Sequence, residues 1–108
     1  MKANELMIGD WVYNLVADIT FQIYPQFFSQ WHNRPEQFEA IIQPIPLTAE
    51  ILEKNFPTAG ELAWWPVEDG LHCESRNTED IMASGVFRFV HQLQHALRLC
   101  GITKEITL

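Results

Sequence analysis

The chain has 108 residues, of which 47% are apolar, and it carries a formal charge of −7. This length predicts a single domain over residues 1–108, and the apolar content excludes global disorder. The fourteen acidic residues outnumber seven basic residues that are scattered along the chain. Because phosphate contacts need clustered Lys and Arg, this balance argues against nucleic-acid binding. An acidic surface favours solubility or attracts a basic partner.

The sequence also predicts a cytoplasmic protein that does not contact the membrane. No apolar run approaches the roughly 20 residues that span a bilayer, and residues 1–10 lack the apolar stretch of a signal peptide. We expect Cys73 and Cys100 to be reduced, because a secreted domain of this size often carries more cysteines. A single disulfide between them stays an open alternative.

The first half of the chain is read mainly as strands. Residues 11–13 are β-prone, residues 19–24 alternate apolar with polar side chains, and residues 14–18 between them predict a hairpin. Pro25 ends the second strand because proline cannot donate to a ladder. We read residues 27–35 as irregular and residues 38–43 as a further strand.

The second half opens with a clear helix signal over residues 48–55. Thr48 is a good N-cap, and Pro57 follows the helix. Residues 62–67 predict a strand that Pro66 places at a sheet edge, and residues 68–70 predict a turn into a return strand over residues 71–74. We read residues 75–80 as a polar loop.

Residues 86–100 predict the main helix, which is amphipathic, with Gly101 as the residue that ends it. Its start is open, because residues 86–89 would also suit a strand end. Alternation over residues 102–108 predicts a last short strand. The apolar arc is Val86, Phe89, Val90, Leu93, Ala96, Leu97 and Cys100, and the polar arc is Arg88, His91, Gln94, His95 and Arg98.

Three segments together resemble a known family: ANELxIGDWV at residues 3–12, PIPLTxEIL at residues 44–52 and VHQLQxAL at residues 90–97, where x is any residue. The chain is similar to a family of small uncharacterised proteins of Bacteroides-type gut bacteria and their phages and mobile elements. The resemblance implies a small α+β domain with a strongly bent antiparallel sheet or SH3-like barrel, and a late helix followed by a strand. It implies no activity. The chain departs from the family pattern at residues 25–35 and 64–85.

No catalytic, cofactor or metal motif stands out. His91 and His95 have the i, i+4 spacing of metal ligands, and His72 with Cys73 would complete a tetrahedral set. Gln92, however, replaces the Glu of the zinc-protease pattern. We therefore expect no metal and no cofactor. Neighbours on a strand point to opposite faces, so His72 and Cys73 are badly placed for a thiol nucleophile with its base.

The aromatic content is the feature that points to a function. Trp64 and Trp65 are adjacent on a predicted strand, so one of them faces away from the core unless loops cover it. Together with Trp31, Phe27 and Phe28, the exposed one would form an interaction surface. The alternative is that the irregular segment packs over this tryptophan.

The sequence therefore predicts an α+β fold and, as leading function, a non-enzymatic protein-binding or adaptor protein of prophage or mobile-element origin. A nucleic-acid-binding small barrel is the second hypothesis, against which the charge argues. An enzyme without a recognisable motif is the third. The protein partner and the oligomeric state stay open.

Overall fold

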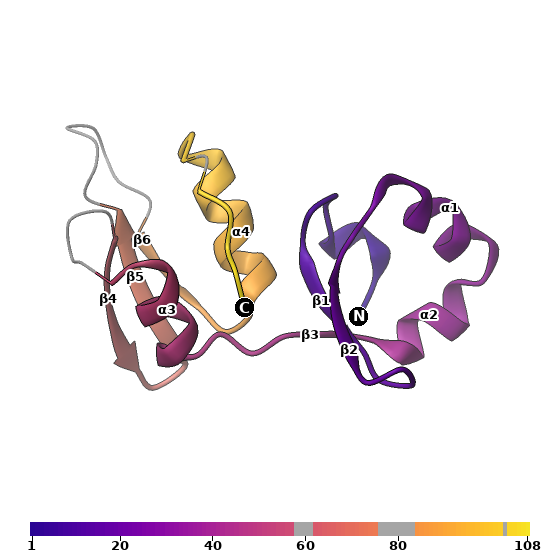
Figure 1. The fold of residues 1–108 in the computed structure, drawn as a ribbon, viewed down its shortest axis with the longest axis horizontal. Coiled ribbons are helices and arrows are strands. Elements are labelled where there is room, and N and C mark those ends of the chain that lie inside the picture. Colours follow the sequence, from indigo (N-terminus) through magenta and orange to yellow (C-terminus); the bar gives the residue numbers. More distant parts are fainter. Residues whose placement is uncertain (58–61, 76–83, 103) are drawn as a thin grey trace. The chain divides into compact units, whose positions relative to one another are not determined.

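The computed structural model describes residues 1–57, 62–75, 84–102 and 104–108. They form an α+β fold with two three-stranded antiparallel sheets, neither of which closes into a barrel in the described part of the chain. The expected SH3-like barrel is therefore not found. The chain divides into two compact units, Met1–Ile45 (unit 1) and Pro46–Leu108 (unit 2) (Figure 1). One domain over residues 1–108 stays a prediction.

Unit 1 contains the predicted hairpin. Strand β1 pairs with β2 on one side and with β3 on the other. The turn between β1 and β2 places Asp18 in the left-handed region at φ 55°, where the side chain of Tyr13 donates a hydrogen bond to its carboxylate. The elements of unit 1 are a 3₁₀ turn Ala3–Glu5, β1 Trp11–Asn14, β2 Ile19–Gln22, α1 Pro25–Asn33, α2 Pro35–Ile41 and β3 Ile42–Pro44.

Two helices occupy the segment that was predicted to be irregular or extended, so this prediction was wrong. Pro25 and Pro35 each stand at a helix start, where the missing N–H costs nothing and the fixed φ favours the helix. Phe27 and Trp31, four residues apart on α1, are both buried. The predicted strand over residues 38–43 survives only as β3.

The core of unit 1 is aromatic. The ring of Phe27 meets those of Phe21, Trp31 and Phe38 edge-on, with centroids 5.2–5.8 Å apart. Such edge-to-face pairs stabilise beyond their buried area. Of the residues predicted to line the buried face of β2 and its extension, Ile23 is buried and Phe21 half-buried, but Ile19 is exposed. The buried residues are Leu6, Val12, Ile23, Phe27, Trp31 and Ile42.

The first elements of unit 2, a helix followed by a strand and its return strand, appear in the predicted order. The Thr48 hydroxyl accepts a hydrogen bond from the Ile51 N–H at 3.3 Å and caps α3 as expected. Gly101, with φ 72°, ends α4. Strand β4, which holds Pro66, is an edge strand in the order β4-β5-β6. The elements are α3 Ala49–Asn55, β4 Leu62–Val67, β5 Gly70–Ser75, β6 Ser84–Phe87 and α4 Val90–Leu99.

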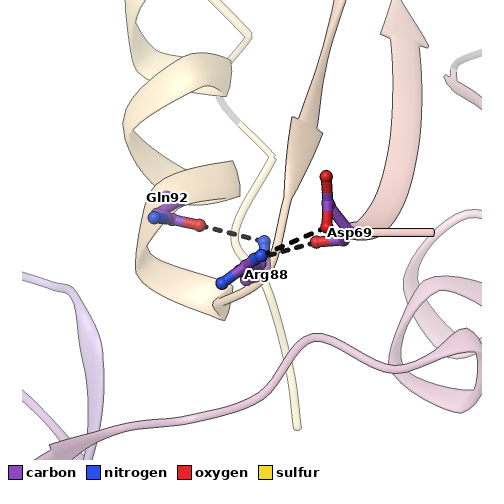
Figure 2. Close-up of polar contacts among 3 residues, drawn as sticks. All are labelled: Asp69, Arg88 and Gln92. Atoms are coloured by element: carbon purple, nitrogen blue, oxygen red, sulfur yellow. Dashed lines mark hydrogen bonds and ion pairs between the residues drawn. The ribbon is translucent and has the colours of Figure 1, made fainter. Parts of the chain in front are cut away.

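The sequence left open whether residues 86–89 begin the main helix or end a strand. The structure shows a strand followed by the helix. Residues 84–87 pair with β5, and α4 begins at Val90. The side chain of Gln92 reaches back and accepts hydrogen bonds from the N–H groups of Arg88 (2.9 Å) and Phe89 (3.2 Å). The Arg88 guanidinium bonds the carbonyl of Asp69 at 3.0 Å and its carboxylate at 3.4 Å (Figure 2). These bonds connect the β4–β5 turn to the approach to α4.

The described residues of the C-terminal segment contain no strand, so the prediction for residues 102–108 was wrong there. The backbone of Thr107 pairs with a side chain instead. The Asn55 amide donates to the Thr107 carbonyl, and its oxygen accepts from the Thr107 N–H, both at 2.8 Å. Most of the predicted polar loop, residues 76–80, lies outside the described residues.

Candidate functional site: the outer face of the unit 2 sheet

The register of the unit 2 sheet divides its side chains between two faces. Trp65 lies opposite His72, which in turn lies opposite Val86. Because side chains alternate along a strand, this row shares one face with Val67 and Glu74. The next row, Trp64, Cys73 and Gly85, belongs to the other face. We call the first the outer face; its described residues are Ala63, Trp65, Val67, His72, Glu74, Ser84 and Val86.

The inner face packs against α4 around a small apolar cavity. Cys73 is buried there, and burial raises the pKa of its thiol to about 11. Cys100 opens on the same cavity, and both cysteines are free. The cavity measures about 10 Å³, which suits one water at most and no substrate. Its lining is Leu62, Cys73, Phe87, Leu93, Ala96, Leu97, Cys100 and Ile102.

The outer face exposes Trp65, whose side chain packs against a neighbouring histidine. The Trp65 side chain is 41% exposed, and its indole stacks on the His72 ring with centroids 4.4 Å apart and an interplanar angle of 22°. His72 Nε2 donates to the Glu74 carboxylate at 3.1 Å. The three side chains thus form a connected row of indole, imidazole and carboxylate. Val67 and Val86 add exposed apolar surface beside it.

This arrangement narrows the interaction surface predicted from sequence. Trp65 faces outward and Trp64 is less exposed, so the prediction that the pair divides between two faces is confirmed. Phe27 and Trp31, in contrast, are core residues of unit 1, and Phe28 packs against that core. Phe27 and Trp31 are therefore too buried to form an exposed patch. The interpretation of the sequence missed the helical spacing of α1 that buries them.

Sequence reasoning missed Val67, His72 and Val86 as outer-face residues. The signal was present for β4 and β5: counting two positions from Trp65 reaches Val67, and the short turn at residues 68–70 sets His72 opposite Trp65. Val86 could not be placed on this face, because the sequence left residues 86–89 open between a helix start and a strand end.

The sequence predicted that the histidines of α4 lie on a polar, solvent-facing side of the helix, but they are buried or half-buried. His91 is 6% exposed and Gln94 is also buried, whereas His95 is half-buried. The His91 and His95 rings meet edge-on with centroids 5.7 Å apart. In the described residues, no three His, Cys, Asp or Glu side chains gather as a metal would require. His72 points to the outer face and Cys73 to the inner one, so the two do not form a catalytic pair.

A larger hollow lies among the described residues of each unit. In unit 2, a hollow of about 300 Å³ lies along α4 and the segment after it, and Gln94, Arg98, Lys104 and Glu105 contribute its polar lining. In unit 1, a hollow of about 480 Å³ lies beside α1, with His32 and Trp31 in its wall. Neither has a serine, threonine or cysteine among its described lining residues.

None of the described helices is long and apolar enough to cross a membrane. Comparison of the chain with models of known protein families, with curated proteins and with solved structures finds no match. The outer face therefore has to be interpreted from its own chemistry.

Proposed function

We propose that the protein is a non-enzymatic protein-binding or adaptor protein, of the mobile-element origin that the family resemblance implies, and that it binds its partner through the outer face of the unit 2 sheet. The observation that carries the proposal is Trp65, a large aromatic side chain that is 41% exposed and held flat against His72. A fixed indole loses little conformational entropy on binding. Exposed tryptophans of this kind are enriched among the residues that dominate binding energy at interfaces.

Two neighbours favour a protein partner over a single stacked ligand. Val67 and Val86 lie on the same face and are exposed, so the apolar surface extends beyond the indole. Interfaces combine such an aromatic and aliphatic centre with a polar rim, and His72 and Glu74 supply polar groups here.

The charge of the same face favours protein over nucleic acid. Trp65 and His72 would offer stacking platforms for bases, but a strand of nucleic acid also needs cations along its phosphates. The described strand positions of the outer face carry no Lys or Arg, and their one formal charge is the carboxylate of Glu74. Arg88 lies at the end of the face beside Gly70, where its guanidinium is paired with Asp69.

Site-specific photo-crosslinking in the native cell tests the proposal. A photoreactive amino acid replaces Val67 in one full-length variant, Val86 in a second and Leu99 in a third. Leu99 is the matched control, because it is apolar, 89% exposed and lies at the end of α4. We expect positions 67 and 86 to yield the same crosslinked protein, identified by mass spectrometry, and position 99 not to yield it.

The purified partner then provides a binding measurement. Trp65→Thr keeps a β-prone residue on the edge strand and should weaken binding by about 2 kcal/mol or more, as for a central interface residue. Identical products from all three crosslinking positions, or equal affinity of Trp65→Thr and wild type, would show that the outer face is not the binding surface.

A further inference from the structure

We propose that the partner presents a basic protein segment to the outer face, with an arginine or lysine side chain laid over Trp65 and directed at Glu74. This inference rests on the proposed function and adds the chemistry of the partner. The inference is based on His72, which contacts both the exposed indole of Trp65 and the carboxylate of Glu74.

The positions of Trp65 and Glu74 suit a single long cationic side chain. Trp65 lies opposite His72 on the neighbouring strand, and Glu74 is two residues farther along β5. Trp65 and Glu74 are therefore diagonal neighbours on one face, which in an antiparallel pair are about 7–8 Å apart and within reach of a long side chain. A guanidinium over the indole gains a cation–π attraction, and its N–H groups match a carboxylate.

The indole and the carboxylate are both available to a partner. His72 stacks on one face of Trp65, and the side chain as a whole is still 41% exposed. The Glu74 side chain is 37% exposed, and its bond to His72 uses one carboxylate oxygen, Oε1. The second oxygen leaves acceptor capacity for a guanidinium or ammonium group.

Charge around the face has the complementary sign. Glu68 and Asp69 are exposed in the turn that joins β4 to β5. Arg88, beside this turn, is already paired with Asp69 at 3.4 Å. Residues 46–108 as a whole contain nine acidic and five basic residues. A basic segment is attracted to such a surface, and an acidic one is repelled.

A peptide titration of the full-length protein tests the inference before any partner is known. A short oligoarginine peptide is titrated into labelled protein while the indole N–H of Trp65 and the His72 ring are followed by NMR, with an oligoglutamate peptide of equal length as the counter-probe. We expect the arginine peptide to shift these signals and the glutamate peptide to leave them unchanged.

Matched variants separate a site from general attraction to an acidic protein. Glu74→Gln and Glu53→Gln remove the same charge, but Glu53 is exposed on α3 and lies outside the outer face. We expect Glu74→Gln and Trp65→Thr each to raise the Kd for the arginine peptide about two- to fivefold, and Glu53→Gln to change it less. Equal effects of Glu74→Gln and Glu53→Gln overturn the inference, with circular dichroism confirming that each variant is folded.

The crosslinked partner distinguishes failure of this inference from failure of the proposed function. If the partner binds in a Trp65-dependent way but its Kd is unchanged by Glu74→Gln, the outer face is the binding surface and the basic segment is wrong. If neither Trp65 nor Glu74 matters, both proposals fall.

Discussion

The side chain of Asn55 forms backbone hydrogen bonds of the kind that a neighbouring strand would otherwise form. It is 4% exposed, and its amide makes three hydrogen bonds of 2.8 Å, one to the Ile51 carbonyl and two to the backbone of Thr107. The last two reproduce the paired donor and acceptor that a neighbouring strand would offer. A buried amide without these partners would be costly, so the segment after α4 and the end of α3 depend on each other.

Replacing Asn55 tests this dependence. Asn55→Ala leaves the Thr107 N–H and carbonyl without their present partner, and we expect the free energy of unfolding to fall by about 1–3 kcal/mol. Urea denaturation measures it. Glu53→Gln, on the exposed side of the same helix, should stay within about 0.5 kcal/mol of wild type. A similar small effect of Asn55→Ala would mean that water replaces the amide at little cost.

Cys73 should be the inert cysteine of the pair. Its pKa is raised to about 11 by burial, and the thiolate is the reactive species. We therefore expect iodoacetamide to modify the partly exposed Cys100 first, and Cys73 only when the protein unfolds. Peptide mapping after timed alkylation checks the order, and faster labelling of Cys73 in the native protein would contradict it.

The same shift has a consequence for stability against pH. An unfolded thiol ionises near its ordinary pKa of 9.0, whereas the folded one holds its proton until about 11. The unfolded state therefore loses its proton first, and stability falls as the pH rises from about 9 through 11. Thermal melts of wild type and Cys73→Ala across this range isolate the contribution, since the variant should be less stable at neutral pH but should decline less steeply.

At the scale of elements, the sequence pattern predicted the helices and strands that are fixed by contacts between residues close in sequence. The Thr48 cap and the β4–β5 turn are local signals, and both appear as expected. Pro25 was predicted to end a strand, and Pro35 was placed in an irregular segment. Their position at a helix start becomes clear only when the buried aromatic side of α1 is known. The alternation of apolar and polar side chains over residues 102–108 did not produce a strand. The backbone N–H of Thr107 bonds the side chain of Asn55 and not a neighbouring strand.

The candidate site was predicted in part for the same reason. Alternation alone showed that Trp64 and Trp65 divide between two faces, but only the register brings His72 beside Trp65. Trp31 entered the predicted surface because its segment seemed irregular, and the helix that buries it also depends on packing. Propensity is a weak guide wherever packing decides the element.

Helix α4 offers a direct test of its assigned faces. Leu93 is fully buried and shares the inner cavity with Cys73, whereas Leu99 is largely exposed. Leu93→Ala should cost about 2–5 kcal/mol through lost burial and a residual cavity, and Leu99→Ala should stay within about 0.5 kcal/mol. Denaturant melts of both variants provide the comparison. Equal costs would place the apolar side of α4 elsewhere.

At the scale of the whole molecule, charge is the property that constrains partners most. The net charge of −7 is shared by both units, since residues 1–45 contain five acidic and two basic residues. A net negative charge on each unit disfavours the approach of a phosphate backbone. It does not hinder a basic protein segment.

We therefore expect no appreciable binding to duplex or single-stranded DNA at about 0.15 M salt, because no counterions would be released from phosphates by clustered cations. A mobility-shift titration with the full-length protein checks this. Sub-micromolar binding at that salt concentration would restore the nucleic-acid hypothesis.

The bond between Asn55 and Thr107 also bears on how the protein is made. The two residues are 52 positions apart, so a ribosome must add all the residues between them before this contact can form. Unit 1 is compact within residues Met1–Ile45. Its aromatic core can begin to assemble while unit 2 is still being synthesised, in the order usual for chains that fold from the N-terminus. Unit 2 cannot complete the contact between Asn55 and Thr107 until Thr107 has been synthesised.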